Sequence, residues 1–219
     1  MKYSIVMPVL LRDPAHKEVL QATIASVREK STDYELIIVD DGSPFATGFL
    51  KEEADIYIRH NKNMGIAPSW NDGVAVARGE YVVVINDDIL VPHQWLEKLA
   101  EVNLNGISSP NNGYDGVSAY KWYPGYCFCL SRYAIEKIGR FDEQFVPFNF
   151  EDTDYWTRAL KDNVPMVRAD FNVWHKEGDV IHKLKYDEVS KENHEKFIKK
   201  HGFGPQPYFF GDGDIQDIL

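Results

Sequence analysis

The chain has 219 residues, of which 44% are hydrophobic and 26% are charged. This length corresponds to one large domain or two small ones. The 24 Lys and Arg residues are outnumbered by 34 Asp and Glu residues, which gives a formal net charge of −10. Such a surface repels a phosphate backbone, so nucleic acid is not expected as the main partner. A nucleotide diphosphate would need a cation or a helix N-terminus to offset the same repulsion.

Signals for disulfides, export and membrane insertion are weak. The two cysteines, Cys127 and Cys129, are too few for a disulfide framework or a zinc site, so we interpret them as small apolar residues. Pro8 interrupts the apolar N-terminus and no small-residue cleavage site follows, which argues against a signal peptide. No run approaches the roughly 18 apolar residues of a membrane span. We expect a soluble cytoplasmic protein, and peripheral binding to a membrane stays open.

The first half of the chain alternates short β-branched runs with amphipathic stretches, which is typical of parallel βα units. Asp13-Pro14 predicts a capped helix start after the first strand, and Ser43-Pro44 predicts another after the second. A helix from about 68 to 77, closed by Gly79, is expected after the third strand, and Pro92 is expected to open one after the fourth. The four expected strands are residues 3–9, 35–39, 56–59 and 81–85.

The second half is less regular. Ser131 is expected to cap a short helix that ends at Gly139, and a further helix is expected to start near Glu151. The other expected elements are strands at 126–130, 164–167 and 172–175 and a charged helix from about 187 to 200. The sequence therefore predicts an α/β fold with a Rossmann-like, mainly parallel central sheet flanked by helices.

Two of the expected strands end in paired acids. Asp40-Asp41-Gly42-Ser43 follows the second strand, and Asn86-Asp87-Asp88 follows the fourth. Because parallel strands end at a common crevice, we expect both pairs to face one pocket. Adjacent carboxylates at a buried strand end repel each other unless a cation lies between them, which favours a divalent metal at Asp87-Asp88. The structural alternative for both segments is a solvated turn.

The second half supplies further candidates. Glu151-Asp152-Thr153-Asp154 puts three acids in the first turn of a helix, where the macrodipole alone would stabilise them. The functional interpretation is a general base, with Arg158 one turn further on holding the motif in place. A lone histidine such as His175 is more often structural than functional. Aromatic residues near Trp122 and Tyr126 are suited to stack on a sugar ring, although core packing is the more common role.

An ordered set of motifs runs from residue 3 to about residue 182. It comprises Ser4-Ile5-Val6-Met7-Pro8, residues 35–43, Asn63-Met64-Gly65 with Asn71, Gly73, Ala77 and Gly79-Glu80-Tyr81, Asn86-Asp87-Asp88, residues 139–143, and Glu151-Asp152-Thr153-Asp154 with Arg158. In this order the motifs resemble those of the family 2 glycosyltransferases of the GT-A fold, and most closely the rhamnosyltransferase-like members. No single motif is specific, but the ordered set is.

The resemblance implies a nucleotide-diphosphate sugar donor of the UDP, GDP or dTDP type. Asp88 would hold Mn²⁺ or Mg²⁺ against the diphosphate, and His175 matches a histidine that completes the metal shell in some members. Oxygen ligands plus one imidazole suit Mn²⁺. The residues implied to bind the nucleotide sugar are Pro8, Val9, Asp40, Asp41, Asn63, Gly65, Asn86 and Asp87.

Asp152 matches the catalytic base of the family, which removes a proton from the acceptor hydroxyl as the oxygen attacks the anomeric carbon. This implies a single displacement with inversion, through an oxocarbenium-like transition state. Glu151, Arg158, Trp122 and Tyr126 are the candidates for supporting the base or contacting the acceptor. The acceptor class, whether glycan, lipid-linked or protein, stays open.

The expected domain is residues 1–201, with a nucleotide-sugar-binding half at 1–105, an acceptor and catalytic half at 106–201, and an unassigned tail at 202–219. Asn86 replaces the first acid of a strict Asp-x-Asp motif, which leaves fewer carboxylates for a metal. No membrane helices follow the domain, which favours a single-transfer enzyme. Two rival functions stay open. They are a sugar nucleotidyltransferase, against which residues 8–14 contain no glycine, and a non-catalytic nucleotide- or sugar-binding module.

Overall fold

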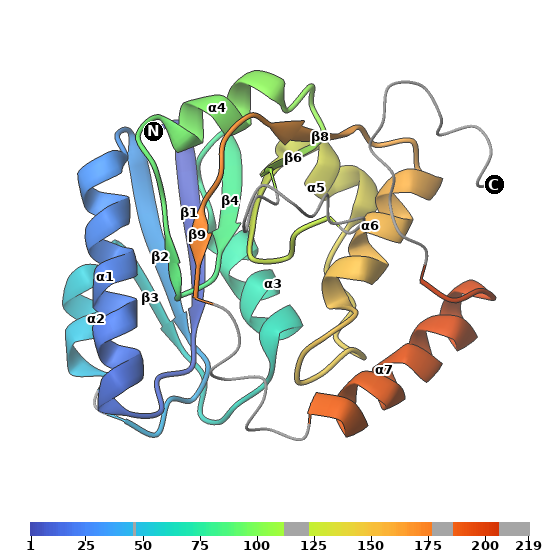
Figure 1. Cartoon of the computed structure of the whole chain (residues 1–219), viewed down its shortest axis with the longest axis horizontal. Helices are drawn as coiled ribbons and strands as arrows, with labels where there is room; N and C mark the ends of the chain where they lie inside the picture. Colours follow the sequence, from blue (N-terminus) through green and yellow to red (C-terminus); the bar gives the residue numbers. More distant parts are fainter. Residues whose placement is uncertain (46, 112–122, 177–185, 206–219) are drawn as a thin grey trace.

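A seven-stranded sheet forms the centre of the molecule (Figure 1). The computed structural model describes residues 1–45, 47–111, 123–176 and 186–205. The strands occur in the order β3-β2-β1-β4-β7-β6-β8, and only the two pairings of β7 are antiparallel within this sheet. Their bounds are β1 (Tyr3–Val9), β2 (Tyr34–Asp40), β3 (Ile56–Arg59), β4 (Tyr81–Ile85), β6 (Ile107–Pro110), β7 (Cys127–Ser131) and β8 (Met166–Ala169). The predicted mainly parallel sheet is confirmed.

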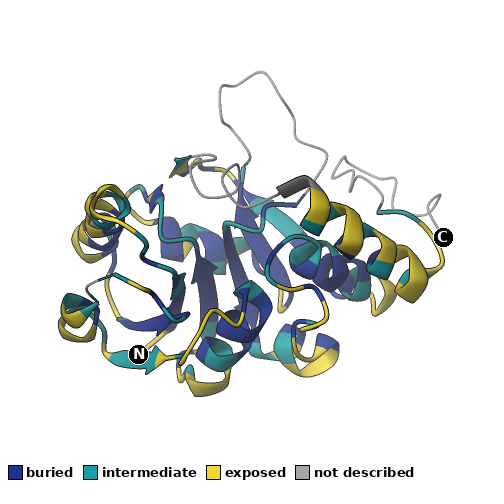
Figure 2. Cartoon of the chain, turned by 90° about the horizontal axis from the view of Figure 1, so that it is seen from below, coloured by how far each residue is buried: buried dark blue, intermediate teal, exposed yellow. Residues whose placement is uncertain are grey.

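Helices cover both faces of the sheet, and the buried side chains form two clusters divided by it (Figure 2). One cluster joins alternate β1 residues such as Ile5 to helices α1, α2 and α4, whereas the other joins Val6 to α3, α5 and α6. Cys127 and Cys129 are buried in the first cluster as free thiols, as predicted. The helices are α1 (Pro14–Lys30), α2 (Gly48–Glu53), α3 (Ile66–Val76), α4 (Trp95–Val102), α5 (Arg132–Ile138), α6 (Glu151–Lys161) and α7 (Tyr186–His201).

Several helix boundaries differ from the prediction. Helix α2 begins after Thr47 rather than at Ser43, because the Ser43 hydroxyl accepts the Leu11 N–H and stays in the loop. Helix α3 begins at Ile66, two residues before Pro68, since a proline is tolerated in the first turn, where backbone N–H groups have no helical partner. Helix α4 begins only at Trp95 because Gln94 adopts a left-handed conformation with φ 60°.

The caps of two other helices match the prediction. The Asp13 side chain accepts the His16 N–H at the start of α1, with Pro14 in the first helical position. The Ser131 side chain accepts the Ala134 N–H at the start of α5. The last expected strand shrinks to β9 (Trp174–His175), which pairs with β5 (Ile89–Leu90) in a separate two-stranded sheet. This small sheet brings His175 next to the end of β4.

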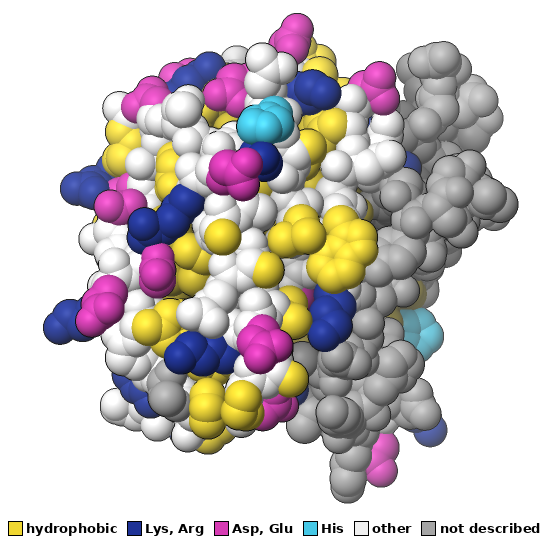
Figure 3. Space-filling model, turned by 60° about the vertical axis from the view of Figure 1, so that its left-hand side comes forward, with side chains coloured by type: hydrophobic (Ala, Val, Ile, Leu, Met, Phe, Trp, Pro, Cys, Tyr) yellow, Lys and Arg dark blue, Asp and Glu magenta, His cyan; other side chains and the backbone are white. Residues whose placement is uncertain are grey.

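The charges on the surface and the character of the helices limit the partners of the protein. Acidic and basic side chains are interspersed on the described face of Figure 3, which therefore presents no extended basic patch. None of the described helices combines the length and the apolar character needed to cross a membrane. Strands β1, β2 and β4 are adjacent and parallel, so their carboxyl ends share one edge of the sheet. A ligand site is expected at such an edge.

Candidate functional site

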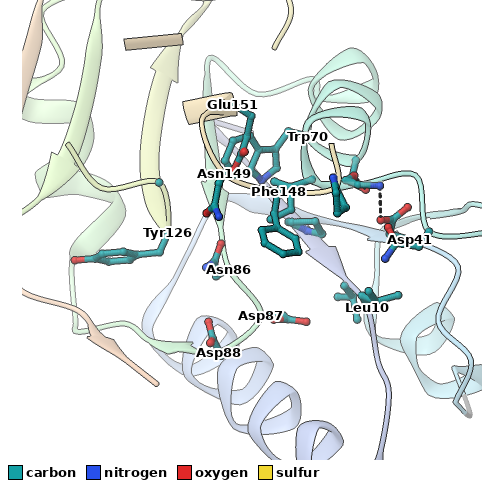
Figure 4. Close-up of a pocket in the computed structure, with 18 of the residues that line it drawn as sticks. Leu10, Asp41, Trp70, Asn86, Asp87, Asp88, Tyr126, Phe148, Asn149 and Glu151 are labelled. Atoms are coloured by element: carbon teal, nitrogen blue, oxygen red, sulfur yellow. Dashed lines mark hydrogen bonds between the residues drawn. The ribbon is translucent and has the colours of Figure 1, made fainter. Parts of the chain in front are cut away.

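A cavity of 330 Å³ lies at the carboxyl ends of β1, β2 and β4, with the start of α6 on its other side (Figure 4). Its lining contains every predicted site residue except Asp40, Arg158 and Trp122. The predicted residues that it brings together are Pro8, Val9, Asp41, Asn63, Gly65, Asn86, Asp87, Asp88, Tyr126, Glu151, Asp152 and His175. Three separate segments of the chain, at Asp41, at Asp87-Asp88 and at Glu151-Asp152, thus place their acids in one cavity.

Asp40 and Asp41 use their carboxylates on neighbouring protein groups. Asp40 is fully buried and accepts hydrogen bonds from Ser43 N at 2.9 Å, from the Tyr57 hydroxyl at 2.7 Å and from the Arg59 guanidinium. It does not line the cavity. Asp40 therefore holds the loop after β2 against strand β3.

Asp41 lines the cavity but is also engaged. Its two oxygens accept hydrogen bonds from Met64 N at 2.7 Å and Gly65 N at 2.9 Å, and His60 Nδ1 lies 2.7 Å from Oδ1. Gly65 has φ 100°, and a Cβ there would lie 2.9 Å from the Pro147 carbonyl oxygen, so a side chain would be strained and crowded. The Asp41 carboxylate therefore fixes the loop that forms one wall of the cavity.

Asp87 and Asp88 face two imidazoles. His16 Nε2 lies 3.1 Å from Asp87 Oδ2, and His175 Nε2 lies 3.1 Å from Asp88 Oδ1. Burial raises the pKa of Asp88, the His175 imidazole opposes the rise, and the charge of Asp87 adds to it. The contact with Asp87 raises the pKa of His16 despite burial. A cation near these carboxylates would relieve the repulsion between them.

His175 is held in place by two neighbours. Its ring stacks on that of Tyr126, with centroids 4.6 Å apart, and its backbone pairs with Ile89 in the small sheet. Asn86 Nδ2 lies 3.5 Å from His175 Nε2, and the Asn86 backbone N–H donates to the Tyr126 carbonyl. Tyr126 thus supports the histidine.

Asp88 and His175 fit a divalent cation as two neighbouring ligands. Asp88 Oδ1 is buried and, among the described residues, accepts no hydrogen bond with acceptable geometry, although His175 Nε2 is 3.1 Å away. Cis ligands of an octahedral Mn²⁺ or Mg²⁺ ion lie roughly 3 Å apart, because each bond is about 2.1 Å. In the described part of the chain no group of three His, Cys, Asp or Glu residues could hold a metal. The remaining ligands would have to come from substrate phosphate and water, as is usual for Mg²⁺.

Glu151 and Asp152 begin α6, and both line the cavity. Glu151 lies at the end of the cavity away from Asp87 and Asp88 (Figure 4). Burial raises the pKa of Asp152, while the Thr153 N–H and hydroxyl, both donating to Oδ1, oppose the rise. Burial and the Asp152 charge raise the pKa of Glu151 well above its usual value, and its buried Oε2 has no hydrogen-bond partner in the described chain. A base with a raised pKa accepts a proton more readily once it is ionised.

Gly125 lets the chain pass close to Asp152. A Cβ at this position would lie 2.4 Å from Asp152 Oδ2, so any side chain would displace the carboxylate. Gly125 also lines the cavity. The sequence contains no local signal for this role, because the contact joins residues that are far apart in the chain.

Two predicted residues lie elsewhere. Arg158 holds Asp154, as predicted, through Nε at 2.9 Å from Oδ2, and it also donates to the Ile138 and Arg140 carbonyl oxygens. It supports helix α6 from outside the cavity. Trp122 lies outside the described residues.

Arg12, His16 and Trp70 also line the cavity and were not predicted from the sequence. Arg12 is partly buried, and burial lowers its pKa. Its guanidinium makes no hydrogen bond or ion pair with any residue that the structure describes, so an anion could pair with it. A signal for the first two was present: they flank Asp13-Pro14, and the helix start after β1 must lie at the same edge of the sheet. Trp70 carried no such signal.

Most of the chain matches the model of one protein family. The model of the family described as "Glycosyl transferase family 2" matches residues 4–168, which is most of the chain. The chain is a family 2 glycosyltransferase. GlyG, a glycosyltransferase of Streptococcus pneumoniae, is 26% identical over 147 residues, covering 62% of this chain and 48% of the relative. An undecaprenyl-phosphate 4-deoxy-4-formamido-L-arabinose transferase of Proteus mirabilis is 30% identical over 123 residues, or 53% and 36% of the two chains.

Solved structures show that this glycosyltransferase has the GT-A fold. S. aureus TarS superposes with a TM-score of 0.65 at 13% identity, over 90% of this chain and 40% of TarS. GalNAc-T7, solved with UDP, GalNAc and Mn²⁺, gives a TM-score of 0.69 at 12% identity, over 90% and 48% of the chains. The chain spans about half or less of the curated relatives given above. None of these four names mentions rhamnose, so the similarity to rhamnosyltransferase-like members stays a prediction.

Proposed function

We propose that the protein transfers a sugar from a nucleotide-diphosphate sugar to an acceptor hydroxyl, with inversion, and that Asp152 is the general base. One observation carries the proposal: a single cavity has a candidate cation site at Asp88 and His175 and a buried carboxylate at Asp152. Strands β1 to β4 form the donor side and the start of α6 forms the acceptor side. The predicted halves 1–105 and 106–201 stay a prediction, since His175, from the second half, lies beside Asp88 on the donor side.

The donor side holds the nucleotide diphosphate. Pro8 and Val9 line the cavity at the end of β1, and Arg12 and His16 put two basic groups near Asp87. Asp88 and His175 would hold Mn²⁺ or Mg²⁺, and this ion would offset the negative charge on the departing diphosphate. The metal ion and the basic side chains are needed because a protein with a net charge of −10 otherwise repels the diphosphate.

The acceptor side removes the proton. Asp152 binds the acceptor hydroxyl through a carboxylate oxygen and takes its proton as the acceptor oxygen bonds to the anomeric carbon and the bond to the diphosphate oxygen breaks. Thr153 donates two hydrogen bonds to Asp152 Oδ1 and so orients the carboxylate. Burial and the charge of Asp152 raise the pKa of Glu151 well above its usual value, which disfavours two negative charges on this adjacent pair.

The chemical class of the acceptor decides whether the reaction needs a general base. The Proteus mirabilis relative is named for undecaprenyl phosphate. A phosphate oxygen that is already ionised needs no general base, whereas a hydroxyl does. The buried carboxylate in the cavity therefore favours a hydroxyl on a glycan, lipid-linked or protein acceptor.

Donor binding is tested by thermal shift with UDP, GDP, CDP and dTDP and their sugars, each with and without Mn²⁺. A nucleotide present at 100 times its Kd should raise the stability by about 2.7 kcal/mol. We expect the nucleotides of one nucleobase to give a metal-dependent shift in Tm. Release of pyrophosphate from a nucleoside triphosphate and a sugar phosphate would instead identify a nucleotidyltransferase. Binding with no turnover across a broad acceptor panel would identify a non-catalytic module.

The base is tested with Asp152→Asn, whose amide cannot accept the proton. We expect kcat to fall by about 10²–10⁴-fold while the nucleotide Kd stays the same. In the wild type, log kcat/KM should fall with decreasing pH through the raised pKa of Asp152, so the acid limb lies above the usual carboxyl range of about 4. Near-normal turnover in the variant would remove Asp152 from this role.

A further inference from the structure

The turn that leads into α6 contains two consecutive non-glycine residues in the left-handed region. Asn149 has φ 70° and Phe150 has φ 73°. Phe150 caps α6 without a side-chain hydrogen bond, so the helix start lacks the usual local support. Such a conformation costs free energy and persists only where surrounding contacts impose it. Glu151 and Asp152 follow directly.

Helix α7 supplies these contacts. Asn193 is fully buried, and its Nδ2 donates to the Phe148 carbonyl at 2.8 Å and to the Asn149 carbonyl at 3.1 Å. The Asn149 side chain donates in turn to the Ser190 hydroxyl at 2.7 Å. One side-chain amide therefore satisfies the carbonyl groups of Phe148 and Asn149 at the strained turn. Phe148 and Asn149 line the cavity.

The same helix also holds the chain after Asp152. His201 Nε2 lies 2.8 Å and Lys200 Nζ 2.6 Å from Oδ1 of the fully buried Asp154. Between these ends, Phe197 is fully buried with its ring 5.9 Å from that of Phe150. Helix α7 runs beside α6 in Figure 1. It thus contacts the chain on both sides of Asp152.

We propose that Asn193 is a positioning residue, which sets the place of the Asp152 carboxylate by fixing the turn at residues 148–150. This inference rests on the proposed role of Asp152 as the base. Asn193 is not itself among the residues that line the cavity. It also lies outside residues 4–168, which the family model matches. A misplacement of about 1 Å at a reacting group costs about 10²-fold in rate.

The test uses Asn193→Asp, which keeps the size of the side chain but replaces both N–H donors with an oxygen that repels the two carbonyl groups. Lys199→Ala is the matched control, because Lys199 is exposed on the same helix. For each protein we would measure hydrogen exchange over residues 147–154, the Kd for UDP, GDP and dTDP with Mn²⁺, and turnover of the sugar nucleotide that the wild type uses. Ser190→Ala is a milder second variant, which remains informative if Asn193→Asp does not fold.

We expect Asn193→Asp to increase exchange over 147–154 by about tenfold or more and to lower kcat by about 10–100-fold, with nucleotide Kd unchanged within about twofold. Ser190→Ala should change exchange and kcat in the same direction by less, and Lys199→Ala should change neither. Unchanged exchange in both Asn193→Asp and Ser190→Ala would overturn the inference, and so would raised exchange with normal kcat. A wild type that turns over no sugar nucleotide, with residues 147–154 protected, would instead overturn the proposed function.

Discussion

The acid pairs at the ends of β2 and β4 lie at the same edge of the sheet, but they have different partners. After β2, Asp40 and Asp41 accept backbone N–H groups and pair with Arg59 and His60. These partners belong to the loops and strands around the pair. The β2 pair therefore organises the wall of the cavity.

The β4 pair is arranged differently. Asp87 and Asp88 each have an imidazole nitrogen at 3.1 Å, and Asp88 Oδ1 accepts no hydrogen bond from the described residues. Burial leaves Asp88 with a raised pKa, which marks an ionised form that the protein alone stabilises poorly. The comparison teaches that an acid pair is a candidate cation site when its neighbours leave an oxygen without a donor.

Among substitutions in the two acid pairs, Asp88→Ala is expected to have the largest effect on function. Removing the carboxylate would leave one protein donor for a divalent ion, so we expect kcat/KM to fall on the order of 10³-fold, which corresponds to about 4 kcal/mol. The Mn²⁺-dependent thermal shift with nucleotide should disappear. The Tm without ligand should stay the same or rise, because the ionised carboxylate is disfavoured in the folded state.

Glu52→Gln is the control for this experiment, since it removes an exposed carboxylate on α2 and leaves the cavity unchanged. It should keep the metal-dependent shift and the activity. If Asp88→Ala kept both as well, the β4 pair would be no more functional than the β2 pair.

Asp40→Asn is expected to lower stability with little effect on ligand binding. The substitution removes a buried acceptor of charge-assisted hydrogen bonds, which costs about 2 kcal/mol, while the Arg59 side chain stays 44% exposed and hydrated. For a domain of this size, Tm should fall by about 4–8 °C. Calorimetry and nucleotide titration would separate the two effects. A stable Asp40→Asn protein that no longer binds nucleotide would place Asp40 in the ligand site.

Local signals were enough for much of the fold. Apolar runs predicted β1 to β4, and Asp13-Pro14 and Ser131 predicted the starts of α1 and α5. The boundary errors arose where a tertiary contact or a backbone conformation decides the helix start, as at Ser43 and Gln94. Such contacts are not encoded in neighbouring residues.

The cavity residues were predictable where a motif coincided with a strand end, as at Asp88, or with a helix start, as at Asp152. The different use of Asp40 and Asp41 was not predictable, because Arg59, His60 and Gly65 reach them through the arrangement of β3 and the next loop. Gly125 and Asn193 act at distances of 27 and more than 40 residues along the chain from their partners. One sequence gives no direct information about such pairs.

His60→Gln should have the smallest effect and should depend on pH. Burial lowers the pKa of His60, but the contacts with Asp41 and Asp72 outweigh it and the pKa is raised. The charged imidazole therefore stabilises the fold below its unfolded pKa of about 6.5, and this contribution is lost as the pH rises through the folded value. At pH 6 we expect the variant to lose about 1 kcal/mol, or about 2–4 °C in Tm.

The same loss should vanish in alkaline buffer, where His60 is neutral in both states. The control is His93→Gln, which replaces an exposed histidine on the surface. Because the Met64 and Gly65 N–H groups still hold Asp41, nucleotide binding should persist in His60→Gln. A loss of stability that stays constant from pH 6 to pH 9 would contradict the ion pair. A loss of nucleotide binding with normal stability would show that the β2 pair, like Asp87 and Asp88, takes part in ligand binding.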